Sequence, residues 1–267
     1  MKIISWNVNG IRSINGQNPS KKFDKITKEN KLFDFINREN PDIICIQETK
    51  ADLEQLNEDL KYPPGYYGFY HSSRSKKGYS GVVTYSKIQP KSHNISIGIE
   101  KFDIEGRIVE TEFDEFILLN VYFPNGTSGM HRVDYKLEFY DALFNYLEPH
   151  RKSGKRLIIC GDYNTAHHEI DLARPKENID TSGFMPIERE KLDKIVGLGY
   201  VDTFRQFNNE PNHYTWWSNR ARARENNVGW RIDYHFVTEN LMPLVTNSYH
   251  LPSEEGSDHC PIVLEIN

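Results

Sequence analysis

The chain has 267 residues, 37% of them hydrophobic and 12% aromatic, which suits one folded α/β domain. No apolar stretch approaches the ~20 residues of a membrane-spanning helix, so we expect a globular protein with no membrane partner. The net charge of −5 argues against a surface coated with positive charge for unspecific binding of nucleic acid. The net charge does not exclude a local basic surface.

The residues after Met1 alternate like a strand and lack the basic start, apolar stretch and cleavage site of a signal peptide. We therefore expect an intracellular, cytoplasmic protein. The cysteines Cys45, Cys160 and Cys260 are far apart and have no metal-binding spacing. This pattern predicts buried free thiols rather than disulfides or a zinc site.

In chain order, apolar periodicity predicts strands that alternate with helices over the first two-thirds of the chain. Strands are expected at residues 2–8, 43–46, 82–85, 108–113, 117–122, 157–160, 234–237 and 262–266. Helices are expected at residues 32–40, 137–147 and 186–198, with a polar loop from Gly10 to Lys28. Strands close together in sequence, such as 108–113 and 117–122, indicate antiparallel pairing.

The chain shows no internal repeat, low-complexity tract or Gly/Ser linker that would divide it. One domain covering residues 1–267 is the simplest organisation. The order of elements predicts an α/β fold with mixed sheets flanked by helices.

Polar side chains gather where the predicted strands end or begin. The set is Asn7, Asn9, Glu48, Tyr122, Asn125, Asp162, Asn164, Asp233, Asp258 and His259. If the last two strands run antiparallel to the earlier ones, their starts share a rim with the other strands' ends. Four carboxylates would then meet one histidine.

Such crowding of like charges is unfavourable unless a cation or hydrogen bonds compensate it. Oxygen ligands without cysteine suit hard Mg²⁺, with Mn²⁺ as a substitute. Because Mg²⁺ keeps waters and meets phosphates, the sequence points to phosphate-ester chemistry.

Seven motifs spread along the chain resemble the exonuclease III family of abasic-site endonucleases, in that family's order. They are residues 5–10, 46–50, 78–81, 120–126, 161–164, 228–234 and 256–261. The resemblance implies a DNase I-like four-layer α/β sandwich, in which two sheets pack face to face between helices. It also implies Mg²⁺-dependent hydrolysis of duplex DNA 5′ to an abasic site, leaving a 3′-hydroxyl, together with 3′-end trimming and 3′–5′ exonuclease action in base excision repair.

The resemblance also assigns roles to residues. Glu48 is implied as the principal metal ligand, supported by Asn7 and Asp258. Asp162 would activate the attacking water, and Asn164 would orient it. In some family schemes Asp162 and Asn164 are also ligands, His259 is a further candidate ligand, and the number of metals stays open.

The phosphate-binding roles fall on another group. His259 would contact the scissile phosphate while Asp233 fixes its tautomer. Tyr122 is implied at the phosphate as well. The group that protonates the leaving oxygen is Tyr122, a metal-bound water or another donor.

The segment from His213 to Ile232 has four arginines against one glutamate, a local balance of +3, with three interleaved tryptophans. Trp216, Trp230 and Ile232 match family positions that wall the pocket for the flipped abasic sugar, whereas Trp217 is expected to be structural. Arg220, Arg222 and Arg224 recur every second residue and would share one side of an extended loop. Further expected DNA contacts are Arg12, Lys77, Tyr79, Arg107 and Asn125.

The sequence departs from the family pattern in two places. Asn9 stands where some members have aspartate, and the loop Ile14 to Glu29 is longer than in compact relatives. The expected partner is duplex DNA containing abasic sites or blocked 3′ ends, bound by a monomer. The alternatives are a phosphatase or lipid phosphodiesterase of the same superfamily, and a DNA-binding module without catalysis.

Overall fold

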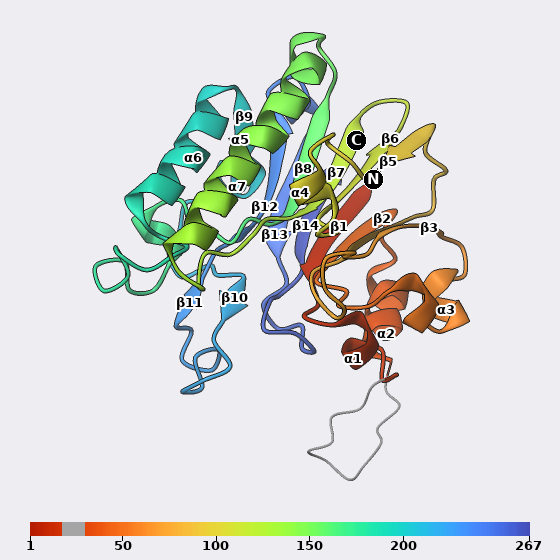
Figure 1. The fold of residues 1–267 in the computed structure, drawn as a ribbon, viewed down its shortest axis with the longest axis horizontal. Helices are drawn as coiled ribbons and strands as arrows, with labels where there is room; N and C mark the ends of the chain where they lie inside the picture. Colours follow the sequence, from red (N-terminus) through yellow and green to blue (C-terminus); the bar gives the residue numbers. More distant parts are fainter. Residues whose placement is uncertain (18–29) are drawn as a thin grey trace.

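The computed structural model describes residues 1–17 and 30–267, which build two six-stranded β-sheets packed face to face (Figure 1). The first sheet contains, in spatial order, β13 (Val245–His250), β14 (Ile262–Ile266), β1 (Lys2–Asn7), β2 (Ile43–Gln47), β4 (Val82–Ser86) and β3 (Tyr67–His71). The second contains β5 (Ser92–Asn94), β6 (Ile108–Glu112), β7 (Ile117–Tyr122), β8 (Leu157–Asp162), β12 (Asp233–Thr238) and β9 (Tyr200–Asp202). A separate pair is formed by β10 (Trp216–Trp217) and β11 (Gly229–Trp230).

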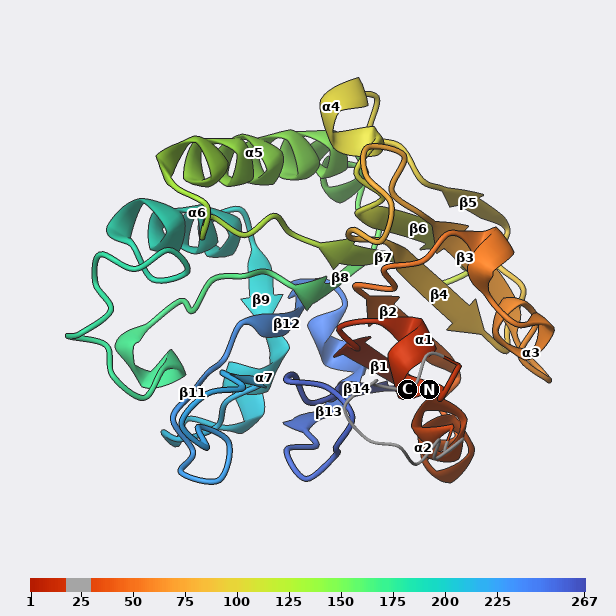
Figure 2. The ribbon, with the colours of Figure 1, turned by 60° about the horizontal axis from the view of Figure 1, so that its bottom comes forward.

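Helices cover the outer faces of both sheets (Figure 2). The second sheet is covered by α5 (Met130–Lys152) and α6 (Pro186–Gly197), and the first by α1 (Ile11–Ile14), α2 (Lys31–Glu39) and α3 (Glu58–Lys61). The connections contain α4 (Glu100–Asp103), α7 (Thr203–Phe207) and the 3₁₀ turns Leu53–Gln55, Glu169–Asp171 and Met242–Leu244. The fold is therefore the four-layer α/β sandwich that the family resemblance implies.

The apolar run that begins β8 shows why central strands lose their alternation in sequence. Ile158 and Cys160 face the other sheet, whereas Leu157 and Ile159 pack in the cluster that contains α5 and α6. All four side chains are fully buried. A strand covered on both sides needs apolar residues at every position, as the sequence of β8 shows.

The predicted strands and helices all occur, and their ends agree within two residues except for α5, which begins seven residues before and ends five residues after its expected bounds. Helix α2 ends where Asn40 adopts the left-handed conformation, directly before Pro41. The predicted pairing of residues 108–113 with 117–122 is antiparallel, as β6 and β7. The three cysteines are free and buried, as expected.

The loop predicted from Gly10 to Lys28 is wrong at its start, because residues 11–14 form α1. Gly10 has a φ of 123°, and Ile11 and Ile14 then place both side chains on one buried face. Two apolar residues in a polar stretch were too weak a signal to predict a helix. The rest of this loop, including most of the long segment Ile14 to Glu29, lies outside the described residues.

Strand directions bring the polar strand ends to one edge of the sandwich. β1 and β2 are parallel, as are β7 and β8. β14 runs antiparallel to β1, and β12 runs antiparallel to β8 with Asp233 opposite Asp162. The ends of four strands and the starts of two later strands therefore meet, as the sequence predicted.

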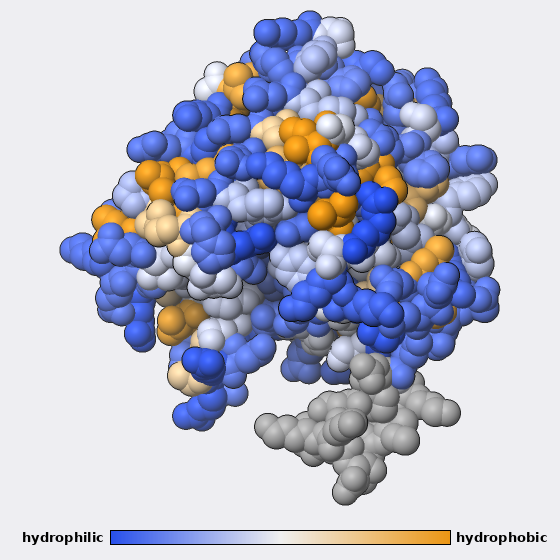
Figure 3. Space-filling model, viewed as in Figure 1, coloured by the Kyte–Doolittle hydropathy of each residue, from blue (hydrophilic) through white to orange (hydrophobic). Residues whose placement is uncertain are grey.

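The outer surface gives few signs of a large apolar contact area. The face shown in Figure 3 is mostly hydrophilic, with apolar residues in small separate patches. In residues 1–17 and 30–267, no helix is both long enough and apolar enough to cross a lipid bilayer.

Candidate active site

The edge where the strands meet is organised around Asn7, at the end of β1. Its side-chain amide donates to Glu48 Oε1 at 2.8 Å and to Asp162 Oδ2 at 2.9 Å. Glu48 follows β2 and belongs to the first sheet, whereas Asp162 ends β8 in the second. Asn7 thus joins one carboxylate from each sheet, and its amide hydrogens partly compensate the negative charge of both.

His259 lies between two buried aspartates. Its Nδ1 is 2.9 Å from Asp233 Oδ2, and its Nε2 is 3.8 Å from Asp162 Oδ2. Thr215 donates to the same Asp233 oxygen at 2.6 Å, while Trp6 Nε1 donates to the His259 carbonyl at 3.1 Å. These contacts hold the imidazole in place and leave Nε2 facing the pocket.

The ionisation of this pair is set by burial and by neighbouring charges. Although burial alone lowers it, the negative charges of Asp233 and Asp162 raise the pKa of His259 to about 10. Burial, together with the charges of Asp233 and Glu48, raises the pKa of Asp162 to about 7. A carboxylate with a pKa near 7 suits a general base at neutral pH.

A glycine determines how β8 delivers Asp162. Gly161 has a φ of 140°, and a Cβ at this position would lie 1.8 Å from the Val121 carbonyl oxygen. Only glycine lets β8 approach β7 this closely immediately before Asp162. Beyond it, Asn164 donates its backbone N–H to Asp162 Oδ1 at 2.8 Å and its side-chain amide to the Phe123 carbonyl at 2.9 Å.

Three side chains within the described residues form a group that can hold a metal ion. Ligand atoms of Glu48, Asp162 and His259 all lie within 4.8 Å of one another. Two carboxylates with one imidazole, and Asn7 beside them, suit a hard divalent cation. The donor set therefore fits the divalent metal that the charge pattern predicted.

Asp258, a predicted metal ligand, is not part of this group of three. Its Oδ1 accepts from Asn9 at 2.9 Å and its Oδ2 accepts from Trp216 Nε1 at 3.1 Å. Despite burial, His259 and these two hydrogen bonds lower the pKa of Asp258. Asp258 thus lines the pocket as a carboxylate that is tied to its tryptophan wall.

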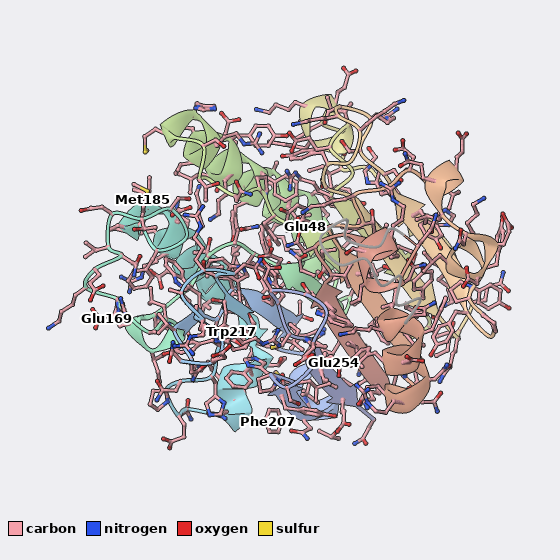
Figure 4. All side chains as sticks on the ribbon, turned by 90° about the horizontal axis from the view of Figure 1, so that it is seen from below. Glu48, Glu169, Met185, Phe207, Trp217 and Glu254 are labelled. Carbon is pink, nitrogen blue, oxygen red and sulfur yellow. The ribbon has the colours of Figure 1, made fainter. Side chains whose placement is uncertain are left out.

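A cavity of about 290 Å³ opens over these groups. Its lining residues are Glu48, Tyr122, Asn125, Thr127, Asp162, Asn164, Thr181, Ser182, Gly183, Trp216, Trp230, Ile232, Asp258 and His259. Figure 4 views the molecule from the edge that carries Glu48. The cavity therefore brings together all predicted metal and phosphate residues except Asn7 and Asp233, which lie buried beneath it.

One side of the cavity is aromatic. Trp216 and Trp230 pair across β10 and β11, with ring centroids 6.4 Å apart and ring planes at 80°. Both rings are partly exposed, and Ile232 extends the same apolar wall. Trp217 is only 4% exposed, which agrees with its predicted structural role.

Arg107 does not fit its expected role as a direct DNA contact, because it is only 1% exposed. Its guanidinium donates to Glu105 at 2.6 Å, to the Tyr122 carbonyl at 2.9 Å and to the Tyr79 hydroxyl at 2.7 Å. Arg132 donates to the same Tyr79 hydroxyl at 3.1 Å. Arg107 therefore positions Tyr79 and Tyr122. From the sequence alone, an arginine with this role looks the same as one that binds phosphate.

The arginines at residues 220, 222 and 224 do not share one side of an extended loop, so that prediction is wrong. The chain turns here, with Ala221 and Arg222 in the left-handed conformation. Arg224 folds back, stacks over Trp217 and donates to the carbonyls of Ser257 and Pro252 at 2.8 and 2.9 Å. Arg220 and Arg222 stay exposed.

The remaining predicted DNA contacts differ in how exposed their side chains are. Lys77 is exposed, and Arg12 is half-buried with one donor to the Lys50 carbonyl at 3.2 Å. Asn125 lines the cavity and accepts from the Thr127 hydroxyl at 3.1 Å. Lys77, Asn125, Arg220 and Arg222 thus keep side chains available beside the cavity or on the surface.

Sequence reasoning missed two functional neighbours of the carboxylates. Lys50 Nζ lies 2.6 Å from Glu48 Oε2, so the two side chains form an ion pair. Thr215, which bonds Asp233, lies in another segment of the chain. Lys50 lies in the motif at residues 46–50, two residues after Glu48, whereas nothing in the sequence pairs Thr215 with Asp233.

Comparisons with known proteins agree with this geometry. The family model described as "Endonuclease/Exonuclease/phosphatase family" matches residues 4–259. An exodeoxyribonuclease from Bacillus subtilis is 41% identical over 269 residues, covering 100% of both chains. A DNA-(apurinic or apyrimidinic site) endonuclease from Dictyostelium discoideum is 40% identical over 273 residues, covering 100% of this chain and 71% of the relative.

The architecture has similar solved structures. An AP endonuclease from Archaeoglobus fulgidus is 27% identical, has a TM-score of 0.86, and is matched over 100% of this chain and 99% of that chain. The similarity spans both sheets and the helices outside them.

Proposed function

This chain belongs to the endonuclease/exonuclease/phosphatase family, and we propose that it is a metal-dependent DNA repair nuclease that cuts duplex DNA 5′ to abasic sites. The product strand would end in a 3′-hydroxyl. We further propose 3′-end trimming and 3′–5′ exonuclease action at the same site, with Mg²⁺ as the metal. The enzyme would act inside the cell and as a monomer; its buried, unpaired cysteines suit a reducing compartment.

One observation carries the proposal: Glu48, Asp162 and His259 face the same cavity, with Asn7 and Asp233 bonded to them from beneath. Hydrolysis of a phosphodiester needs a base for water, donors for the phosphate oxygens and a cation. Asp162 supplies the base, His259 supplies a donor, and Glu48 lies in the group that can hold a cation. All three requirements meet within one cavity.

The chain's own residues divide the work by position. Asp162 accepts the proton of the attacking water, and Asn164 orients that water from beside it. His259, held by Asp233, donates from Nε2 to a nonbridging phosphate oxygen. A divalent cation held by Glu48 and its neighbours would supply positive charge to the phosphate.

The leaving 3′ oxygen needs a proton donor, and Tyr122 is one candidate. Its ring is buried in the cavity wall, and burial with the charges of Glu48 and Asp162 raises the pKa of Tyr122. The phenol therefore stays protonated near neutral pH. Arg107 fixes its backbone carbonyl at 2.9 Å.

The tryptophan wall favours DNA with a missing base over inositol phosphates or lipids. Trp216, Trp230 and Ile232 offer an apolar surface to a sugar that has left the stack, and a nucleotide without a base is cheap to extrude. Exposed Lys77, Arg220 and Arg222 would contact the phosphate backbone. Binding should therefore weaken as salt increases.

A substrate panel tests this proposal. Purified protein is incubated with Mg²⁺, Mn²⁺ or EDTA and with matched duplexes that carry an abasic analogue, a 3′-phosphate, a uracil or no lesion. Inositol phosphates and sphingomyelin are included as alternative substrates. We expect metal-dependent incision 5′ to the abasic analogue.

Three results would contradict the proposal. Persistent incision in EDTA would exclude the metal role, and hydrolysis of inositol phosphates or sphingomyelin without DNA incision would assign the chain to another branch of the family. Binding of abasic DNA without any hydrolysis would instead identify a DNA-binding module.

A further inference from the structure

A fully buried ion pair lies behind the cavity, between α5 and α6. Lys136 Nζ is 2.7 Å from Glu188 Oε1, and both side chains are 0% exposed. Lys136 is the only lysine among the large, fully buried side chains of the described residues. Neither residue lines the cavity or belongs to the group that can hold a metal.

Lys136 reaches the catalytic loop directly. Its ammonium group donates to the Asn164 backbone carbonyl at 2.7 Å. Asn164 has a φ of 52°, a left-handed conformation that its own side chain and this contact stabilise. The lysine therefore holds Asn164, two residues after the proposed base Asp162, from the side away from the cavity.

Glu188 holds an adjoining part of the wall of the same cavity. Its Oε2 accepts from Gly183 N at 2.6 Å, and its Oε1 accepts from the Ser182 hydroxyl at 3.1 Å. Both Gly183 and Ser182 line the cavity. One carboxylate thus ties two wall residues to the start of α6.

Gly183 lies wedged between the catalytic loop and the tryptophan wall. A Cβ on Gly183 would lie 3.2 Å from the Asn164 carbonyl oxygen and 3.3 Å from the Trp230 ring. The Gly183 carbonyl also accepts from Ala166 N at 2.8 Å. A shift of this glycine therefore changes the distance between Asn164 and Trp230.

Stability alone does not require this pair. Buried ion pairs can often be replaced by apolar side chains of similar volume with little loss, because burying the charges is unfavourable. Apolar side chains, however, could not donate to the Asn164 carbonyl or accept from Gly183 N. The pair therefore makes hydrogen bonds to Asn164 and to residues 182–183 at the same time.

We propose that Lys136 and Glu188 are positioning residues that set the width of the cavity between Asn164 and Trp230. On this basis the pair determines selectivity for a sugar without a base over a nucleotide with one. The inference rests on the proposed function for its substrate, but its geometric part is independent of substrate.

The test uses the double variant Lys136→Met/Glu188→Leu, which replaces the pair with apolar side chains. The ratio of kcat/KM for a duplex with an abasic analogue to that for the same duplex with an intact base is measured. Because small errors in placement reduce rates strongly, we expect this ratio to fall about tenfold or more. The single variant Glu188→Gln, which keeps the shape, provides the same measurement if the double variant does not fold.

A second readout does not depend on activity. In ¹H–¹⁵N spectra, the indole signal of Trp230 should move in the variant, whereas that of Trp6, which is 0% exposed in the other sheet's cluster, should not. The matched control is Lys191→Gln/Asp141→Asn, which breaks the 2.5 Å α5–α6 ion pair on the surface. The control should leave both readouts unchanged.

The outcomes separate the two proposals. An equal loss of both rates with an unmoved Trp230 signal would leave the pair a purely structural role and overturn the inference. If the wild-type protein does not incise abasic DNA, the proposed function fails, while the Trp230 signal still decides whether the pair holds the wall.

Discussion

Two clusters of charged side chains meet near the start of β12, and their charges are balanced differently. Asp233, the first residue of β12, belongs to the candidate catalytic cluster, where four carboxylates meet one histidine and the nearby Lys50. Two residues before β12, Arg231 pairs with Asp171 at 2.8 Å and Asp202 at 2.7 Å, and Arg205 adds a second cation to Asp171 at 2.6 Å.

The pKa values report this difference. Despite burial, Arg231 and Arg205 lower the pKa of Asp171, whereas burial and like charges raise the pKa of Asp162 to about 7. In the Arg231 cluster, two arginines balance the charges of two aspartates. In the candidate catalytic cluster, four carboxylates face one histidine and one lysine, and this excess of negative charge is typical of a functional site rather than a structural network.

The largest expected effect is on catalysis. Asp162→Asn should keep the shape of the side chain but remove the base, and a general base contributes roughly 10²–10⁴-fold to a rate. Single-turnover incision of an abasic duplex measures the loss, with DNA binding followed by fluorescence anisotropy. Incision at the wild-type rate would show that another group activates the water.

Removing one cation from the Arg231 cluster should destabilise the fold. Arg231→Met leaves buried Asp171 and Asp202 with less countercharge, so we expect a loss of about 3–5 kcal/mol in the free energy of unfolding. Urea unfolding measures this loss. Lys91→Met, which breaks an exposed pair with Asp114, is the control and should change little; a similar small change for Arg231→Met would contradict the comparison.

Binding of a divalent cation to the candidate catalytic cluster should stabilise the folded state. Because a ligand that binds only the folded state stabilises it, Mg²⁺ at 100 times its Kd should add about 2.7 kcal/mol to the free energy of unfolding relative to EDTA. Glu48→Gln should lose most of this gain. An equal gain in the variant would place the bound metal elsewhere.

The smallest expected effect is on stability at acidic pH. The lowered pKa of Asp171 means that its contribution to stability is present above the ordinary aspartate pKa of about 3.9 and is lost as pH falls below it. Asp171→Asn should therefore make the decline in stability below pH ~4 shallower, at about 1.4 kcal/mol per pKa unit removed. Thermal unfolding between pH 2 and 5 measures the slope, and an unchanged slope would contradict this assignment.

The sequence by itself determined the strands, the main helices and the polar residues gathered at their ends. Runs such as Leu157–Cys160 are apolar at every position because both faces are covered, and a glycine followed by Asp162 marks where the strand delivers a side chain. Motif order added the family and the proposed roles of Glu48, Asp162 and His259. These signals are local, so they are readable without a structure.

Only the tertiary structure decided which charged residues are available to a ligand. Arg107, Arg224 and Arg220 look alike in sequence, yet the first is buried under two tyrosines, the second folds back over Trp217 and the third is exposed. Likewise, the link from Lys136 to Asn164 spans 28 residues, and that from Lys136 to Glu188 spans 52. Burial and long-range partners depend on how the sheets and helices pack, which local sequence patterns do not encode.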